Sequence, residues 1–256
     1  MDGEPVLCVH GLTRNGRDFD VLAVQLAAQG RRVICPDVFG RGFSDWLPDP
    51  KLYSVPVYAQ AFAQLLAHLP KPFDWIGTSM GGLIGMAVAA MPECAPRRMV
   101  LNDIGPFLPA RALQRIADYL TLKHDFASVE EVETHLRLVH ASFGRLSDAE
   151  WRQMAVSSAR LTPEGRWVLH YDPAIAAPAS SGPVTDIDLW QGWGILRLPI
   201  LVLRGAESDL LDEKTAKAME TRPQTRVVTF PDCGHAPALM TAEQTSIIVG
   251  FVNQNA

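Results

Sequence analysis

The sequence predicts an α/β fold, in which a mainly parallel sheet is covered by helices on both faces. Short apolar runs that end in Gly or a polar residue alternate along the chain with stretches of helical apolar spacing. Such an alternation is typical of parallel strands buried on both faces. The rhythm breaks once, from Phe107 to about Ile195, where helical patterns appear without a convincing buried strand.

Six apolar runs are the predicted strands of this sheet. They are PVLCVHG, RRVICPD, FDWIGTS, RRMVLNDIG, LPILVLRG and TRVVTFPDCGH, at residues 5–11, 31–37, 73–79, 97–105, 198–205 and 225–235. Helices are predicted over residues 18–30, 57–69, 80–92, 212–220 and 241–254. The first of these ends in Gly30, a residue favoured just beyond a helix C-terminus.

The break in the rhythm predicts an insertion. We expect residues 1–106 and 196–256 to form one core, and residues 107–195 to form a helical cap or lid over it. Within the insertion, ALQRIADYLTL and SVEEVETHLRLVH have helical spacing, and a stretch rich in Pro, Ser and Gly follows at residues 172–186.

Composition narrows the class of protein. The chain has 256 residues, of which 48% are hydrophobic and 20% charged, as in an ordinary globular protein. A net charge of −5 gives no reason to expect nucleic acid or an anionic membrane as a partner. No apolar run approaches a membrane span, and the first residues lack a signal-peptide pattern. We expect a cytoplasmic protein that acts on a small molecule; its oligomeric state stays open.

The four cysteines predict neither a metal site nor a disulfide. They stand far apart, with no CxxC pair and no histidine at zinc spacing. Cys8 and Cys35 lie in predicted strands and are expected to be small buried hydrophobes. We expect a protein that works without metal or cofactor.

The segment GTSMGG places Ser79 between Gly77 and Gly81, directly after a predicted strand. This Gly-x-Ser-x-Gly pattern is typical of a strand-to-helix turn so tight that the serine is held out at its apex. The five residues alone are a weak signal, because the glycines can also serve only to let a helix approach a strand.

Polar residues at the ends of other strands supply the missing chemistry. Ends of parallel strands gather at one edge of a sheet. A serine, a carboxylate and a histidine follow three of these strands in the order Ser79, Asp209 and His235. Asp103, after the fourth strand, is an alternative position for the carboxylate.

With these residues, the chain closely resembles the α/β-hydrolase fold family, in its serine-hydrolase branch with a helical cap. The resemblance covers nearly the whole chain and rests on HG after the first strand, PDVFGRGFSD, GTSMGG, LNDIGP, LVLRGAESDLL and CGHAP. Members of the family usually carry a β-hairpin before the strand that leads into His-Gly. Here that strand starts near Pro5, so we expect this hairpin to be absent or the sequence to start internally.

The resemblance implies a role for each residue. Ser79 is the expected nucleophile, His235 the base, and Asp209 the acid that orients the imidazole. Backbone N–H groups of Leu12 and Met80 are expected to form the oxyanion hole.

Substrate contacts are predicted less sharply. His10, Phe107, Trp151 and Trp167 are candidates for the substrate pocket, although His10 can also shape the oxyanion loop and the aromatic residues can simply pack the cap. Arg14 and Asn15 follow the oxyanion loop, where they either meet a substrate carboxylate or lie in a solvated loop.

The predicted function is carboxylesterase-like hydrolysis of small to medium esters or lactones through an acyl-enzyme. Ser79 argues against the dehalogenases and epoxide hydrolases of the family, which carry aspartate at the nucleophile position. A carbon–carbon bond hydrolase of the same fold remains an alternative. So does a non-catalytic receptor that uses the capped pocket for a ligand.

Overall fold

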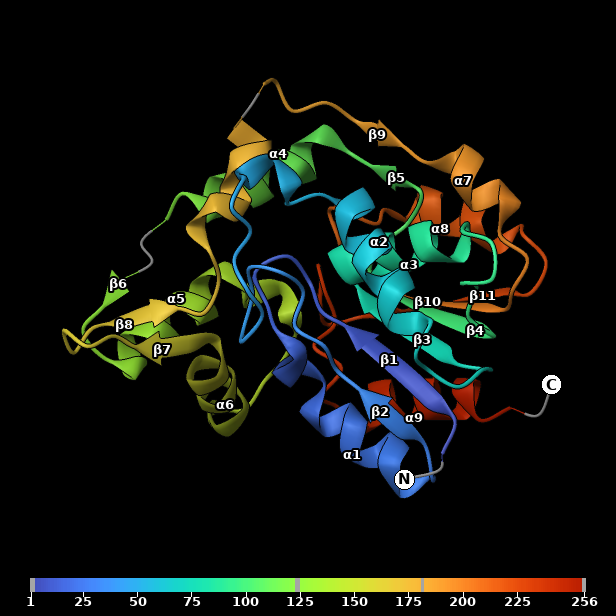
Figure 1. Cartoon of the computed structure of the whole chain (residues 1–256), viewed down its shortest axis with the longest axis horizontal. Coiled ribbons are helices and arrows are strands. Elements are labelled where there is room, and N and C mark those ends of the chain that lie inside the picture. The colour runs from blue at the N-terminus through green and yellow to red at the C-terminus, as the bar shows by residue number, and fades with distance from the viewer. Residues whose placement is uncertain (1–2, 123–124, 181, 255–256) are drawn as a thin grey trace.

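In a computed structural model, which describes residues 3–122, 125–180 and 182–254, six strands form one sheet in the order β11-β10-β4-β3-β1-β2 (Figure 1). The strands are β1 (Pro5–Val9), β2 (Arg32–Ile34), β3 (Asp74–Thr78), β4 (Arg98–Asn102), β10 (Ile200–Gly205) and β11 (Thr225–Phe230). Within the described residues, neighbouring strands of this sheet all pair in parallel. The predicted α/β architecture and its six strands are confirmed.

Helices cover the two faces of the sheet, as Figure 1 shows. Those that pack on the sheet are α1 (Asp20–Ala28), α2 (Val55–Leu66), α3 (Met80–Ala89), α8 (Glu213–Glu220) and α9 (Ala242–Val252). Side chains of β1 alternate between two buried clusters: Val6 packs with residues of α1 and α9, and Leu7 packs with residues of α2 and α3. The continuous apolar runs of the sequence therefore reflect strands that are buried on both sides.

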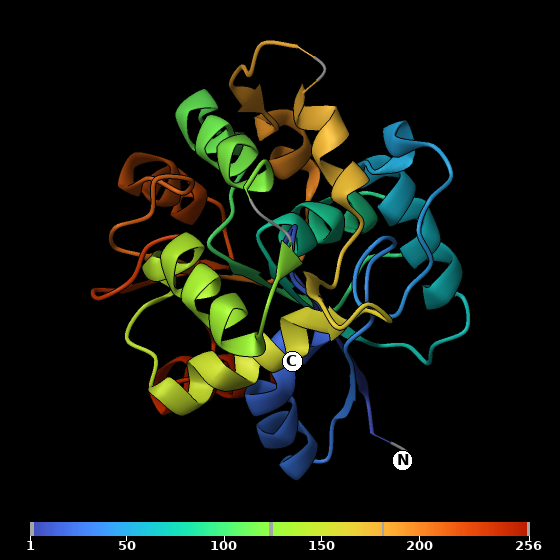
Figure 2. The ribbon, with the colours of Figure 1, turned by 90° about the vertical axis from the view of Figure 1, so that its left-hand side faces the viewer.

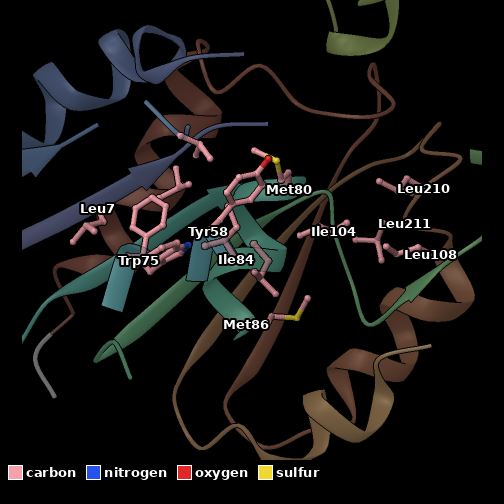
Figure 3. Close-up of a cluster of buried hydrophobic side chains, with 14 of the residues drawn as sticks. Leu7, Tyr58, Trp75, Met80, Ile84, Met86, Ile104, Leu108, Leu210 and Leu211 are labelled. Carbon is pink, nitrogen blue, oxygen red and sulfur yellow. The ribbon is translucent and has the colours of Figure 1, made fainter. Parts of the chain in front are cut away.

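The larger buried cluster extends from the sheet to the base of the cap. In Figure 3, Trp75 and Tyr58 lie beside Ile84 on the α2–α3 side of the sheet, and Ile104 and Leu108 continue the apolar layer away from it. The indole nitrogen of Trp75 donates a hydrogen bond to Gly81 O at 3.0 Å. This layer gives the loops at the strand ends a rigid base.

Residues 107–195 add no strand to the six-stranded sheet in their described part. Their helices are α4 (Ala110–Leu120), α5 (Val129–Val139), α6 (Asp148–Ser158) and α7 (Trp190–Ile195). They also contain short antiparallel strands, which sequence analysis did not predict: β5 (Phe107–Leu108), β6 (Asp125–Phe126), β7 (Ala159–Leu161), β8 (Trp167–Leu169) and β9 (Ile187–Asp188). Strands of two or three residues are too short to show a hydrophobic period.

The elements α4, α5 and α6 lie beyond the carboxyl ends of the strands, on the side to which the β1 arrow points in Figure 1, and Figure 2 views them from that side. Short 3₁₀ helices, η1 (Gly16–Phe19), η2 (Pro50–Leu52), η3 (Ala141–Phe143) and η4 (Pro173–Ser180), lie in the connecting loops.

Backbone groups tie residues 107–195 to the core. Gly42 N donates to His170 O and Asp172 N donates to Gly40 O, both at 2.8 Å. Asn15 Nδ2 donates to Ser157 O at 2.7 Å.

Across the described ranges, every helix falls short of the length and apolar character needed to cross a bilayer.

Candidate active site

The turn between β3 and α3 holds Ser79 in a strained backbone conformation, with φ of 51° and ψ of −115°. Glycines make the turn possible. A Cβ on Gly81 would lie 2.0 Å from Val9 O, and one on Gly77 would lie 2.4 Å from Gly81 O. Non-glycine residues at positive φ are uncommon and often mark functional positions. The glycines therefore allow the close helix–strand approach that leaves Ser79 at the apex.

Ser79 contacts a histidine from the far end of the chain. His235 follows β11, and its Nε2 lies 2.9 Å from Ser79 Oγ. The loop that carries His235 is held by the segment 107–195, because Ser142 Oγ donates to His235 O at 2.6 Å and Gly234 N donates to Ser142 O at 2.7 Å. The structure thus brings together two of the three residues predicted for catalysis.

The carboxylate against this histidine belongs to Asp103. His235 Nδ1 lies 2.8 Å from Asp103 Oδ2. Asp103 is fully buried at the end of β4, and it also accepts hydrogen bonds from Gly205 N and from the hydroxyl of Ser208. Hydrogen bonds from several donors fix the orientation of this buried carboxylate. It can therefore hold the imidazole with Nε2 directed at Ser79.

The prediction that Asp209 orients the histidine is wrong. The Asp209 carboxylate accepts two hydrogen bonds from Arg115 of α4, at 2.6 and 2.8 Å. Partial burial would raise the pKa of Asp209, but the hydrogen bonds and positive charge of Arg115 outweigh it and lower that pKa. Ser208 donates to Asp103, whereas the next residue, Asp209, pairs with Arg115 of α4.

The loop after β1 places Leu12 beside the nucleophile. Leu12 and Met80 both line the cavity that contains Ser79 and His235. Within the described residues, the backbone N–H groups of Leu12 and Met80 have no hydrogen-bond acceptor. Two free N–H groups beside a nucleophile are what an oxyanion hole requires; their role in catalysis remains a prediction.

His10 supports this loop and does not line the cavity. It is fully buried, with Nδ1 2.7 Å from Gly11 O and Nε2 accepting from Val38 N at 2.9 Å. Burial lowers the pKa of His10 to about 4, so the imidazole is neutral at pH 7. The prediction of His10 as a substrate contact is wrong, and the alternative of a loop-shaping residue is the one observed.

Arg41, from the segment PDVFGRGFSD, contacts both predicted oxyanion residues. Its side chain is fully buried; Nε donates to Leu12 O at 2.8 Å, and Nη2 lies 3.5 Å from Met80 Sδ. Nη1 donates to Tyr58 OH and Phe39 O, both at 2.7 Å. The Arg in GRGFSD was a signal for this brace, but only the fold shows which loop it reaches.

A cavity of about 230 Å³ opens at Ser79 between the sheet and residues 107–195. Apolar side chains from both parts line it, including Leu83, Ile104, Leu113, Val139, Met154 and Leu210. Its polar lining includes Arg14, Asp18, Arg115 and His140. The cavity suits a small, largely apolar molecule with a few polar groups.

The predicted aromatic pocket residues lie elsewhere. The described residues that line the cavity do not include Phe107, Trp151 or Trp167. Phe107 pairs with Asp188 between β5 and β9, and Trp167 belongs to the antiparallel strand β8. Trp151 packs beneath the guanidinium of Arg137, 5.5 Å from the ring centroid. Their large apolar surfaces hold the cap together instead.

Asn15 also has a structural role. Its side chain caps η1 by accepting from Arg17 N, and it donates to Ser157 O of the segment 107–195.

In the described ranges, His, Cys, Asp and Glu side chains form no group of three or more that could hold a metal ion. All four cysteines are unpaired.

Comparison with known proteins identifies the family of the chain. Residues 4–239 match the family described as alpha/beta hydrolase fold. The chain is 43% identical to a 3-hydroxybutyrate-oligomer hydrolase of Cupriavidus necator, over 96% of this chain and 87% of that protein. It is 27% identical to an esterase of Mycobacterium tuberculosis, over 83% of this chain and 70% of the esterase.

A solved structure has the same fold. The crystal structure of an alpha/beta hydrolase from Novosphingobium aromaticivorans superposes with a TM-score of 0.87 at 37% identity, covering 97% of this chain and 88% of that one. The fold, the match to the family and the named relatives together show that this chain belongs to the alpha/beta hydrolase fold family, as an ester-bond hydrolase.

Proposed function

We propose that this chain is a serine esterase that cleaves short oligoesters of hydroxy acids through an acyl-enzyme on Ser79. The observation that carries the proposal is the continuous chain of contacts from Ser79 through His235 to Asp103, at the floor of a largely apolar cavity. The oligoester class is supported by the 43% identical relative named 3-hydroxybutyrate-oligomer hydrolase.

In the first half of the reaction, Ser79 Oγ attacks the ester carbonyl carbon while His235 Nε2 takes the hydroxyl proton. Asp103 keeps Nδ1 protonated and stabilises the imidazolium that forms. The negative charge that develops on the carbonyl oxygen is met by N–H groups of Leu12 and Met80. When the tetrahedral intermediate collapses, the bond to the alcohol oxygen breaks, and His235 returns the proton to the departing alcohol.

In the second half, a water molecule takes the place of the alcohol. His235 removes a proton from this water as its oxygen bonds to the acyl carbon, and the bond to Ser79 Oγ then breaks. The proton returns to Ser79, and the acid leaves. Burial of the reacting groups beneath residues 107–195 strengthens each electrostatic contact.

We assign residues 107–195 the role of a cap that selects the acyl group. Leu113, Val139 and Met154 of this segment line the cavity together with Leu83 of the core. A lid of this kind excludes water and sets which acyl chains fit, while the strand-end residues break the bond.

The test uses a small fluorophosphonate, a panel of p-nitrophenyl esters, and 3-hydroxybutyrate dimer and trimer. The proposal requires labelling of the wild-type protein and release of acid from the oligomers. It also requires that Ser79→Ala lose labelling and turnover while keeping its melting temperature. A folded wild-type protein that does not label would leave it as a receptor. Turnover confined to a vinylogous diketone would make it a carbon–carbon bond hydrolase.

A further inference from the structure

The side chain of Arg14 starts near the nucleophile, and both lie close to Gly11. A Cβ placed on Gly11 would lie 3.8 Å from both Arg14 Cγ and Ser79 Cβ, so these two atoms are at most twice that distance apart. Arg14 is only 4% exposed and lines the cavity. Its side chain therefore begins within the reach of a substrate bound to Ser79.

The guanidinium of Arg14 has one unused donor nitrogen. Nε and Nη2 donate to the carboxylate of Asp18, with the shortest contact at 2.6 Å. Within the described residues, Nη1 has no acceptor. It is also not one of the buried side-chain nitrogens that lack a partner, so it is not sealed from solvent. The Asp18 carboxylate balances the positive charge but leaves this N–H free to bind a ligand.

His140 is a second polar group that lines the cavity, and both its burial and the charge of the nearby Arg14 lower its pKa. It is 7% exposed, lines the cavity and stacks on Phe143 with ring centroids 4.4 Å apart. No side-chain hydrogen bond is formed by its ring nitrogens in the described parts of the chain. The adjoining segment is fixed beside the nucleophile, because Ser142 bonds to the backbone of His235.

Charge decides which ligand this pair of side chains can take. Burial lowers the pKa of His140 well below its usual value, and the positive charge of Arg14 acts in the same direction, so His140 is neutral. Arg14 is already paired with Asp18. The two side chains thus offer hydrogen bonds without net positive charge, which favours a neutral acceptor over a carboxylate.

We propose that Arg14 and His140 form a subsite that binds the second, uncleaved ester carbonyl of an oligoester. The proposal rests on the ester hydrolysis proposed above and names the group that distinguishes an oligoester from a simple alkyl ester. In a hydroxybutyrate oligomer, neighbouring ester carbonyls are separated by one short hydroxyacyl unit. With the first carbonyl at Ser79, the next one lies in the cavity that Arg14 and His140 line.

Matched substrates test the subsite on either side of the cleaved bond. On the acyl side, p-nitrophenyl 3-acetoxybutyrate carries the second ester, p-nitrophenyl 3-methylhexanoate replaces it with hydrocarbon, and the p-nitrophenyl monoester of 3-methylglutaric acid replaces it with a carboxylate. On the alcohol side, the butyrate ester of methyl 3-hydroxybutyrate is compared with 2-hexyl butyrate.

The wild-type protein should turn over the diester of at least one pair with kcat/KM about tenfold above its hydrocarbon match, since one buried hydrogen bond is gained. Arg14→Met and His140→Phe should each bring this ratio toward one. In both variants kcat/KM should fall more for the diester than for the hydrocarbon ester, and the fluorophosphonate should still label Ser79. If the unpaired Asp18 carboxylate prevents Arg14→Met from folding, the double variant Arg14→Met with Asp18→Asn takes its place.

Two control variants remove the same groups outside the cavity. Arg17 pairs with Asp20 in an exposed ion pair one turn along, and His170 packs against Phe43. Arg17→Met and His170→Phe should keep the full preference for the diester.

The subsite is refuted if both pairs turn over equally in the wild type, if the folded variants keep the preference, or if the carboxylate probe is preferred. Failure of the esterase proposal would look different, because no ester of the set would then be cleaved and Ser79 would not label.

Discussion

The hydroxyl of Ser208 donates a hydrogen bond to the carboxylate of Asp103. Ser208 in turn accepts from Leu211 N at 3.0 Å, so its own orientation is fixed. The loop after β10 thus supports the acid that follows β4, and its own carboxylate, Asp209, takes no part in the contact.

Asp103→Asn should reduce kcat far more than Asp209→Asn. An amide at position 103 favours the wrong imidazole tautomer, and in a serine protease the corresponding change lowers kcat about 10⁴-fold. Asp209→Asn weakens a half-exposed pair with Arg115, so a change of less than about tenfold is expected. Steady-state kinetics on one p-nitrophenyl ester measures both. The opposite ranking would return the acid to Asp209.

Arg41→Met should lower kcat by about 10-fold to 100-fold with little change in KM. The variant loses the donor that holds Leu12 O, and misplacing one oxyanion donor costs up to about 10³-fold in kcat. Arg98→Met is the matched control, since Arg98 is also buried and donates to backbone carbonyls, but at the start of β4. If both variants lose stability and keep kcat, Arg41 has only a structural role.

On α6, Met154→Ala and Trp151→Ala should have different effects. Met154 lines the cavity, so its truncation should shift the preferred p-nitrophenyl ester toward longer acyl chains. Trp151 packs against Arg137 outside the cavity, so its truncation should cost about 3–5 kcal/mol of stability and leave the acyl profile unchanged. Urea unfolding and the ester panel measure the two effects. An altered profile in a stable Trp151→Ala protein would contradict this division.

Stability should fall as the pH drops below 6.5, with a contribution from His10. Its pKa is about 4 in the folded protein against an ordinary 6.5, so between these values the unfolded chain binds the additional proton. The loss approaches about 1.4 kcal/mol per pH unit in this window. His10→Gln should be less stable than the wild type at neutral pH, and the gap should narrow as pH falls.

The control for this effect is His68→Gln, which changes an exposed histidine. Its unfolding free energy should follow the wild type across the same pH range. A gap between His10→Gln and the wild type that stays constant with pH would show that His10 titrates alike in both states.

Local patterns explain why the turn at Ser79 was predictable and the acid was not. The spacing of Gly77, Ser79 and Gly81 specifies the turn, because each glycine meets a neighbour only a few residues away or on the adjacent strand. Asp103 and Asp209 instead follow β4 and β10, which are neighbours in the sheet and end at the same edge. The order of residues along the chain cannot show which of the two carboxylates contacts His235. The structure shows that it is Asp103, whose carboxylate also accepts a hydrogen bond from Ser208.

The cap illustrates a second limit. Helices α4 and α5 were predicted from their spacing, but the face that a cap helix turns to the cavity depends on tertiary packing. Trp151 and Met154 lie within one turn of the same helix, and only Met154 reaches the cavity. Residue type favoured the tryptophan, whose large surface stabilises the packing of the cap instead.

Residues 107–195 lie between β4 and β10 in the sequence, so they are synthesised before the second part of the sheet. Ser79 and Asp103 are synthesised before it, and His235 only after β11, at the far edge of the sheet. The nucleophile therefore has no base until the second part of the sheet has been made and has paired with β4. Under the proposed mechanism, a nascent or truncated chain that lacks this part has no base to activate Ser79.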